Sequence, residues 1–166
     1  MAPDQDGFNL AVCHGHLEVL KWIQKQNKLS PDQHGATLAA INGHFGVLKL
    51  VREQYGIMPA QCGTNLAAEK GHFEILKWIQ ENNGLLPDQY GVDCTAAKGH
   101  LEVLMWIRGL NGPLPSKFGA NNAAKKGHLQ VLMWIREQNG PLPEQNQDNA
   151  MNNGHLEVAE WIQKQQ

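Results

Sequence analysis

The chain has 166 residues, of which 42% are hydrophobic and 18% charged, and its formal net charge is −2. This balance argues against a protein that binds polyanions, because such proteins normally carry a clear excess of basic residues. No segment approaches the roughly 20 consecutive apolar residues of a membrane-spanning helix, and the first twelve residues lack the pattern of a signal peptide. Three scattered cysteines, Cys13, Cys62 and Cys94, favour the cytoplasm or another reducing intracellular compartment over a disulfide-stabilised fold.

A Gly-His pair recurs along the whole chain and divides it into repeats. The pairs begin at Gly15, Gly43, Gly71, Gly99, Gly127 and Gly154, so the interval is 28 residues, with a last interval of 27. Prolines recur with the same period and place the repeats at 3–30, 31–58, 59–86, 87–114, 115–142 and 143–166. A fixed period of this length is the signature of a solenoid, in which each unit buries its apolar surface by stacking on its neighbours. We therefore expect one repeat array over 1–166 and no single globular core.

The first part of each repeat predicts a short helix that begins just after the proline. The residue after the proline is usually a good N-cap, because its side chain can accept a hydrogen bond from a free backbone N–H at the helix start. These residues are Asp4, Asp32, Asp88, Ser116 and Glu144. An Ala-rich segment such as 36–41 follows and ends at the Gly-His turn. Its small side chains allow the two helices of a repeat to approach closely.

The second part of each repeat predicts an amphipathic helix, which is clearest at 16–24. Its apolar residues cover a broad arc, as expected of a helix that contacts its own partner and both neighbouring repeats. In the first repeat the arc comprises Leu17, Val19, Leu20, Trp22 and Ile23. Two acidic residues lie three positions before a lysine and predict surface ion pairs: Glu18 with Lys21, and Glu74 with Lys77. Three Asn-Gly pairs predict a left-handed stop after the helix, at 83–84, 111–112 and 139–140.

Tryptophan and histidine each occupy one fixed position of the repeat. The tryptophans lie seven residues after the repeat glycine, and Leu50 takes this place in the second repeat, which favours core packing over ligand recognition. The six repeat histidines are expected to bond backbone groups at the turn. A row of metal sites is disfavoured, because equivalent residues of stacked helices lie about 10 Å apart while zinc needs ligands within about 2 Å. A zinc site formed by His14 and His16 is the weaker alternative.

The segments Ala39–Phe45 and Gly15–Lys21 resemble the centre of the ankyrin repeat, in which Ala-Ala-x-x-Gly-His-Leu-Glu-Val joins two helices. The resemblance extends over all six repeats. The 33-residue ankyrin period and its Thr-Pro-Leu-His motif are absent, and the missing residues fall where ankyrins form a β-hairpin. The chain resembles the shortened, Trp-rich ankyrin variants found in large DNA viruses and some microbial eukaryotes. The resemblance implies an all-α, helix-turn-helix solenoid of six stacked repeats with tight proline-containing loops, and a viral relative would act inside the host cell.

No enzymatic motif is present in the sequence. It has no nucleophile elbow, phosphate-binding glycine loop or His-Glu-x-x-His zinc motif, and the cysteines occupy three different repeat positions. We therefore expect a protein that is not an enzyme and has no catalytic residue, cofactor or metal. Binding a protein partner is the usual role of a solenoid, so the predicted function is a monomeric protein-interaction scaffold without membrane contact. The sequence does not name the partner.

The positions that differ between repeats indicate where a partner would bind. They lie three residues after the proline and two residues before the repeat glycine, next to a ladder of lysines at 70, 98 and 126. The two series are Asp6, His34, Cys62, Tyr90, Phe118, Asn146 and Cys13, Ile41, Glu69, Ala97, Lys125, Asn152. The candidate partner-binding residues drawn from them are His34, Ile41, Cys62, Glu69, Lys70, Tyr90, Lys98, Phe118, Lys125 and Lys126. Drift on a solvated surface, or packing of Tyr90 and Phe118 between repeats, are the alternatives.

Two other functions stay open at this point. The lysine ladder at Lys70, Lys98 and Lys126 could bind a nucleic acid or another polyanion, although the net charge disfavours it. The array could also be a spacer with no dedicated ligand. Met105 and Met133 are expected on the outer face of their helices, where adaptable side chains can serve a partner. The polar sixth repeat, with Gln145, Asn146, Asn152 and Asn153, predicts a C-terminal cap.

Overall fold

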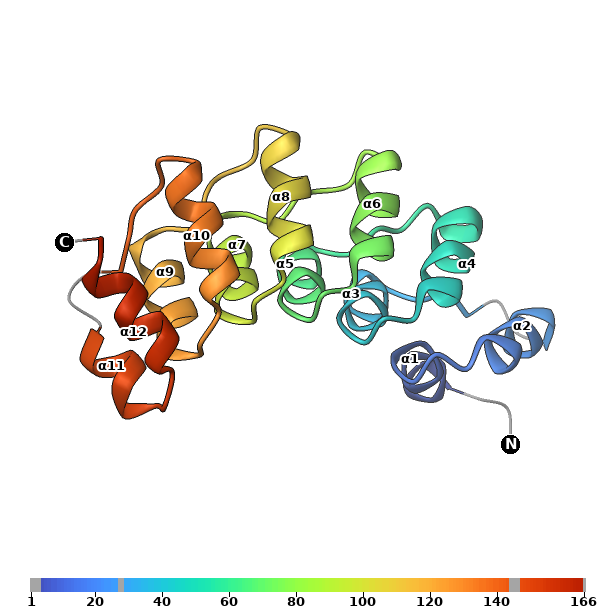
Figure 1. Ribbon diagram of the computed structural model, residues 1–166. Helices are drawn as coiled ribbons and strands as arrows, with labels where there is room; N and C mark the ends of the chain where they lie inside the picture. Colours follow the sequence, from blue (N-terminus) through green and yellow to red (C-terminus); the bar gives the residue numbers. More distant parts are fainter. Residues whose placement is uncertain (1–3, 27–28, 144–146, 166) are drawn as a thin grey trace. The chain divides into compact units, whose positions relative to one another are not determined.

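The computed structural model describes residues 4–26, 29–143 and 147–165 (Figure 1). All regular secondary structure in these residues is helical, with twelve α-helices and no strand, which agrees with the expected all-α fold. The helices are α1 (Gln5–Cys13), α2 (Leu17–Gln26), α3 (Gln33–Ile41), α4 (Phe45–Tyr55), α5 (Gln61–Glu69), α6 (Phe73–Glu81), α7 (Gln89–Ala97), α8 (Leu101–Gly109), α9 (Lys117–Lys125), α10 (Leu129–Glu137), α11 (Gln147–Asn152) and α12 (Leu156–Gln163). Each predicted repeat therefore contains a first and a second helix.

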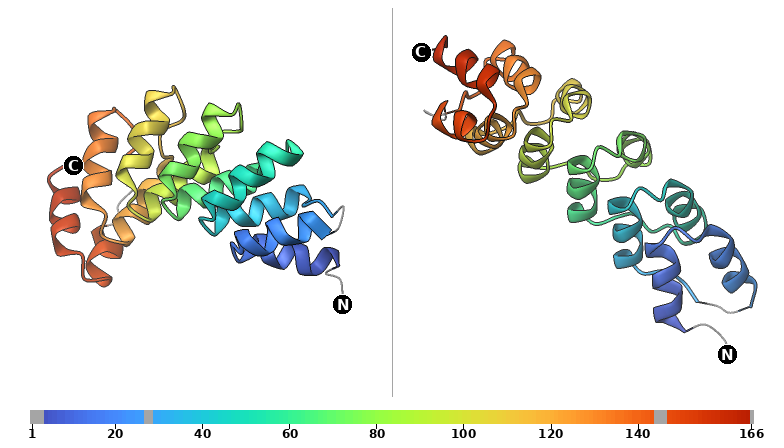
Figure 2. Two further views of the ribbon diagram at one scale, coloured as in Figure 1. Left: turned by 90° about the vertical axis from the view of Figure 1, so that its right-hand side faces the viewer. Right: turned by 60° about the horizontal axis from the view of Figure 1, so that its bottom comes forward.

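The chain divides into two compact units. Unit 1 comprises 1–67 and 72–86, and unit 2 comprises 68–71 and 87–166. Within each unit the first helix of a repeat packs on its own second helix, and first helices of successive repeats pack side by side, as α1 and α3 or α7 and α9 do. In both units the first helices form one layer and the second helices another (Figures 1 and 2). Consecutive helices packed in this way form the all-α helical repeat fold that the period predicts.

The first helices begin as the sequence predicts. The carboxylates of Asp4, Asp32 and Asp88 accept hydrogen bonds from the backbone N–H three residues later, over 2.8 to 3.2 Å. The hydroxyl of Ser116 accepts one from the N–H of Phe118. The N-cap prediction is therefore confirmed at these four positions, while Glu144 lies outside the described residues.

The turn between the two helices requires a glycine at every repeat. All six repeat glycines have φ between 73° and 80°, a left-handed conformation that costs other residues about 1 to 2 kcal/mol. Space is also lacking at this position. A Cβ on Gly15 would lie 2.5 Å from the ring of His44, and one on Gly43 would lie 2.9 Å from the ring of His72. The glycine thus allows both the turn and the close approach of the next repeat.

In the three repeats where Asn-Gly follows the second helix, the asparagine adopts a left-handed conformation and stops the helix. Asn83, Asn111 and Asn139 have φ of 58°, 61° and 55°, which confirms the predicted stop and assigns it to the asparagine. The following glycine donates its N–H back to the helix, as Gly84 does to the carbonyl of Ile79 over 2.8 Å. A Cβ on Gly84 would collide with the side chain of Ile79. This turn therefore requires both the asparagine and the glycine of the pair.

Side-chain hydrogen bonds from the first helices hold the proline loops. The hydroxyl of Thr37 accepts the N–H of Ala60 over 3.0 Å, and the carboxylate of Asp93 accepts the N–H and the hydroxyl of Ser116, both over 2.6 Å. The amides of Gln61 and Gln89 donate to the carbonyl that precedes the next proline, at Leu86 and Leu114. The prolines themselves are buried at 31, 59, 87, 115 and 143. Across the described residues these loops connect the repeats without any β-hairpin, as the sequence predicts.

The core consists of alanines from the first helices and aliphatic residues from the second. Leu20, Ile23, Leu76 and Ile79 are examples with at most 1% of their surface exposed. The expected apolar arc of the first repeat is wrong for Val19 and Trp22, of which 46% and 52% are exposed. Trp78, at the repeat position of Trp22, packs on Phe45 of the preceding repeat, and α2 has no preceding repeat among the described residues.

The polar C-terminal cap expected in the sixth repeat stays a prediction, because most of its polar side chains, at 145–149, lie outside the part of the chain whose side chains the structure describes. Asn152 and Asn153 are exposed, as a cap requires, and Gln145 and Asn146 lie outside the described residues. However, 47% of Met151 and 61% of Leu156 are exposed as well. This repeat therefore presents apolar surface rather than a uniformly polar one.

Candidate protein-interaction surface

One face of each first helix carries the residues that differ most between repeats. The two variable positions predicted from the sequence are seven residues apart, and a helix brings positions i, i+4 and i+7 to one side. The structure thus adds a third position between them. We call the accessible residues at these positions the variable face. They are Asp6, Leu10, Cys13, His34, Leu38, Ile41, Cys62 and Leu66 in unit 1, and Glu69, Tyr90, Cys94, Phe118, Asn122 and Lys125 in unit 2.

The residues predicted to contact a partner are all accessible. Ile41 and Glu69 are half-buried, and the other eight are exposed: His34, Cys62, Lys70, Tyr90, Lys98, Phe118, Lys125 and Lys126. Ala97, which belongs to the same variable series, is buried. Accessibility is what a binding role requires, and the role itself stays a prediction.

The variable face of unit 1 contains an open hollow between α1 and α3. Its volume is about 410 Å³, and it is lined by Asp6, Asn9, Leu10, Cys13, His34 and Leu38. Leu10 is 59% exposed, so the hollow presents an aliphatic surface to solvent. Asp6 and His34 add polar groups beside it. This hollow can accept an apolar side chain whose polar neighbours bond to the rim.

The variable face of unit 2 exposes two aromatic rings. Tyr90 on α7 is 60% exposed and Phe118 on α9 is 62% exposed. The alternative that these rings pack down between repeats is therefore wrong. Because α7 and α9 pack side by side, the two rings stand on neighbouring helices. Together with Lys98, Lys125 and Lys126 they form what we call the Lys–aromatic patch.

The lysines of this patch carry more positive charge than nearby acids neutralise. The ammonium group of Lys98 lies 3.5 Å from the carboxylate of Glu69, and both side chains are partly exposed. Neither Lys125 nor Lys126 forms an ion pair with any carboxylate in the described part of the chain. The patch therefore combines aromatic surface with a local excess of positive charge, although the whole chain is slightly acidic.

The hydroxyl group of Tyr90 keeps its proton. Its hydrogen bond with the side chain of Cys94 raises the pKa of Tyr90 above its ordinary value of 10.0, and electrostatic repulsion from Cys94 and Glu69 adds to this effect. The oxygen of this phenol can still accept a hydrogen bond from a partner. Tyr90 thus offers both an apolar ring and a polar tip, a combination that is common in protein interfaces.

The repeat histidines serve the turns and not the variable face. The Nε2 atom of His72 lies 3.1 Å from the carbonyl oxygen of Ile41, and that of His128 lies 3.2 Å from the carbonyl oxygen of Ala97. The expected bond between histidine and backbone is confirmed at these two positions. The rings of His14 and His16 are 6.0 Å apart. Among the described residues no group of three or more His, Cys, Asp or Glu side chains is placed to hold a metal ion.

The tryptophans are not uniformly buried. Trp134 is 8% exposed, as core packing predicts, and the edge of Trp78 packs on Phe45 with ring centroids 5.9 Å apart. Trp22 is 52% exposed and departs from this prediction. Met105 and Met133 are accessible on the outer face of their helices, as expected.

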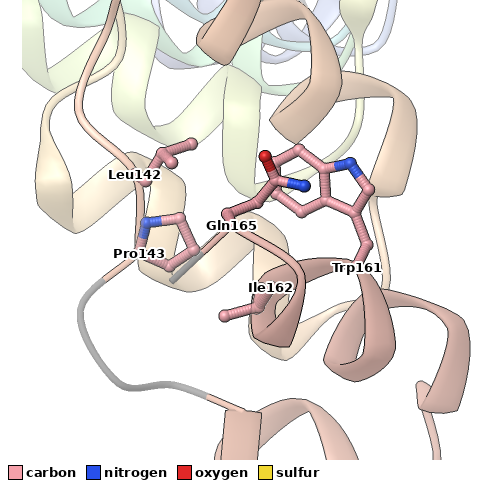
Figure 3. A pocket seen from close by; sticks show the side chains of 5 residues that line it. All are labelled: Leu142, Pro143, Trp161, Ile162 and Gln165. Carbon is pink, nitrogen blue, oxygen red and sulfur yellow. The ribbon is translucent and has the colours of Figure 1, made fainter.

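A small pocket lies beside the last tryptophan. Its volume is about 170 Å³, and Figure 3 shows Leu142 and Pro143 on one side of it and Trp161, Ile162 and Gln165 on the other. Ligand pockets usually measure about 300 to 1,000 Å³, so this one is too small for a typical cofactor. None of the helices in the described ranges is both long and apolar enough to cross a bilayer.

Sequence reasoning missed the middle position of the variable face. Leu10, Leu38, Leu66, Cys94 and Asn122 occupy it, and none of them was among the predicted residues. The signal was available, because the two variable positions imply a third one four residues after the first when the segment is helical. All three cysteines lie on this face, and their thiols are free.

No protein-family model matches the chain. No curated protein matches it significantly either.

Proposed function

We propose that this protein is a non-catalytic protein-interaction scaffold of the ankyrin-repeat type. The observation that carries the proposal is the contrast between the two sides of the first helices. The buried side repeats the same small residues, whereas the variable face changes from repeat to repeat and stays accessible. Packing against neighbouring helices explains why the buried side is the same in every repeat. A solenoid that presents a varied, accessible surface on a constant support is built to bind another macromolecule.

The Lys–aromatic patch suggests the chemistry of the partner. Exposed Tyr90 and Phe118 provide rings of the kind that dominate binding energy at interfaces, and Lys125 and Lys126 provide positive charge that no carboxylate of the described residues pairs. We propose that the patch binds an acidic protein segment that also carries apolar side chains. The accessible thiols at Cys13, Cys62 and Cys94 fit a reducing compartment such as the cytoplasm, where they would stay reduced.

The lysine ladder supports a nucleic-acid function less well. Glu69 stands beside Lys98 and forms an ion pair with it, which lowers the positive potential that a phosphate backbone would need. We therefore place the polyanion alternative second.

Selection of peptides from a random displayed library, with the full chain as bait, tests this function. Selected peptides should combine Asp or Glu with apolar residues, and reversal of charge in the double variant K125E/K126E should weaken their binding at least tenfold. The same reversal at K21E/K25E on α2, outside the patch, is the matched control and should have little effect. Selection of basic peptides, or equal losses in both variants, would contradict the proposal.

A salt titration separates the second function from the first. Binding of a single-stranded oligonucleotide through several phosphates would give a steep linear fall of log K with log salt concentration. We expect no measurable oligonucleotide binding at physiological salt. Tight binding with a steep slope would favour the polyanion function.

A further inference from the structure

The first repeat exposes apolar residues whose counterparts in other repeats are buried. Val19 is 46% exposed, while Val47, Ile75, Val131 and Val158 at the same repeat position are at most 3% exposed. Trp22 follows the same trend, because it is 52% exposed and Trp134 is 8% exposed. His16 and Gly7 lie on this side as well. We call Gly7, His16, Val19 and Trp22 the leading face.

The sixth repeat exposes the opposite half of the repeat contact. Met151 is 47% exposed, although Val12, Ala40 and Ala124 at its position are fully or almost fully buried. Leu156 is 61% exposed, whereas its counterparts Leu17, Phe45 and Leu129 are half-buried. A Cβ built on Gly154 has no atom within 4 Å. We call Met151, Gly154 and Leu156 the trailing face.

Contacts inside unit 1 show how these two kinds of face fit together. The ring of His44 covers Gly15, and the edge of Trp78 packs on Phe45. Gly35 lies against Val12, where a Cβ on the glycine would be 3.4 Å from the valine side chain. Unit 2 repeats the first contact, since His128 covers Gly99 and His155 covers Gly127. In these contacts a glycine or an apolar residue of one repeat faces the histidine, the tryptophan or the first-helix glycine of the next.

We propose that a second copy of this chain stacks its leading face on the trailing face of the first. The match is residue by residue: His16 of one copy would cover Gly154 of the other, Trp22 would pack on Leu156, and Gly7 would lie against Met151. Each pair reproduces a contact that the chain already makes between its own repeats. The contact buries the accessible apolar side chains of both faces, which supplies the driving force.

This association is head-to-tail and uses different surfaces on the two copies. Such a heterologous contact does not close on itself unless the geometry forms a ring, so it can continue from copy to copy. It departs from the monomer expected from the sequence. It also leaves the variable face uncovered, and it therefore goes beyond the proposed function and can fail independently of it.

The experiment is sedimentation velocity of the full chain over a range of concentrations, with two end variants. W22E places a charge on the leading face and L156E places one on the trailing face. Each variant alone should stay monomeric at concentrations where the wild-type chain forms dimers and longer species. An equimolar mixture of W22E and L156E should form a heterodimer and nothing larger, because one intact face of each kind remains.

The control is M105E, which introduces the same charge at a residue that is 53% exposed on α8, away from both faces. It should associate like the wild-type chain, and all variants should keep the wild-type far-UV circular dichroism and melting temperature. A wild-type chain that is monomeric at every concentration would overturn the proposal. A dimer that persists in W22E alone or in L156E alone would also overturn it. Such a dimer could not be the contact between a leading face and a trailing face, because one of these faces is altered in every copy.

Discussion

Gly43 shows how a single residue meets two separate structural requirements. Its φ of 78° favours glycine, and the ring of His72 occupies the space where a Cβ would project. Gly46, three residues later in the chain, is a glycine without either of these requirements. Gly46 lies in helix α4 with ordinary helical geometry, and a Cβ there would be 3.4 Å from the nearest side chain, Leu17.

Substitution of these two glycines by alanine should therefore have opposite effects. G43A should lower the free energy of unfolding by about 1 to 3 kcal/mol, because the left-handed turn becomes strained and the His72 ring must move. G46A should leave it unchanged or raise it by up to about 1 kcal/mol, since alanine favours a helix. Urea denaturation followed by circular dichroism measures both. Equal destabilisation by the two variants would show that the turn does not impose the requirement.

His128 connects residue chemistry to stability at low pH. Burial lowers its pKa below the ordinary value of 6.5, and the positive charges of Lys126, His100 and His155 add to this, while its bond to the carbonyl of Ala97 partly opposes it. The unfolded chain therefore binds a proton at His128 more readily than the folded chain. The contribution of neutral His128 to the stability of the folded chain is therefore complete above pH 6.5, and it declines as the pH falls below this value.

The wild-type chain should accordingly lose stability between pH 7 and pH 5, and H128Q should show a shallower loss over the same interval. Urea midpoints measured at several pH values test this. H34Q, which changes an exposed histidine of the variable face, is the control and should keep the wild-type pH dependence. If H128Q and the wild-type chain follow parallel curves, burial of His128 does not contribute to the acid response.

At the scale of the element, the proline loops depend on the first helix before them. Asp93 is 6% exposed and accepts two hydrogen bonds from Ser116, so its carboxylate is the main polar attachment of the loop that leads to α9. Thr37 makes the corresponding contact with Ala60 in unit 1. These contacts take the place of strand pairing, because no described residue of the loops is in a strand.

Removal of this carboxylate should therefore loosen one loop. D93A should lower the free energy of unfolding by about 1 to 3 kcal/mol, since it removes two charge-assisted hydrogen bonds and leaves the half-buried donors of Ser116 without this partner. D6A makes the same change at an exposed position of α1 and should alter stability by no more than about 0.5 kcal/mol. Hydrogen exchange should show faster opening at Ser116 and Phe118 in D93A. Wild-type protection there would argue that the proline and neighbouring packing suffice to hold the loop.

At the scale of the whole molecule, the repeat period predicted most of the fold. Gly-His spacing, N-cap residues and Asn-Gly pairs are local signals, and the helices begin and turn where these residues stand. Burial at particular positions was harder to predict, because it depends on what covers a residue. Val19 and Val47 have the same place in the repeat, yet one is half exposed and the other buried. The repeat period predicts the same burial for equivalent residues of every repeat, whereas their burial in the structure differs.

The sequence predicted only part of the candidate surface, again because a repeat pattern does not show which residues are covered. Variation between copies identified residues such as His34, Tyr90 and Phe118, because packing does not constrain them. It could not identify Leu10 or Leu38, since leucine recurs there and reads as a core residue. The helical spacing of the two variable positions does imply this middle position, and the structure shows both leucines lining the hollow of unit 1.

The central claim is that the accessible, varied face of the first helices binds a partner. Fluorescence anisotropy with the best selected peptide tests it most directly, on the wild-type chain, on Y90A/F118A and on M105A/M133A, which shortens two accessible residues of the second helices. We expect Y90A/F118A to raise Kd at least tenfold, or about 1.4 kcal/mol, and M105A/M133A to leave Kd unchanged. An unchanged Kd for Y90A/F118A, or an equal loss in both variants, would contradict the account.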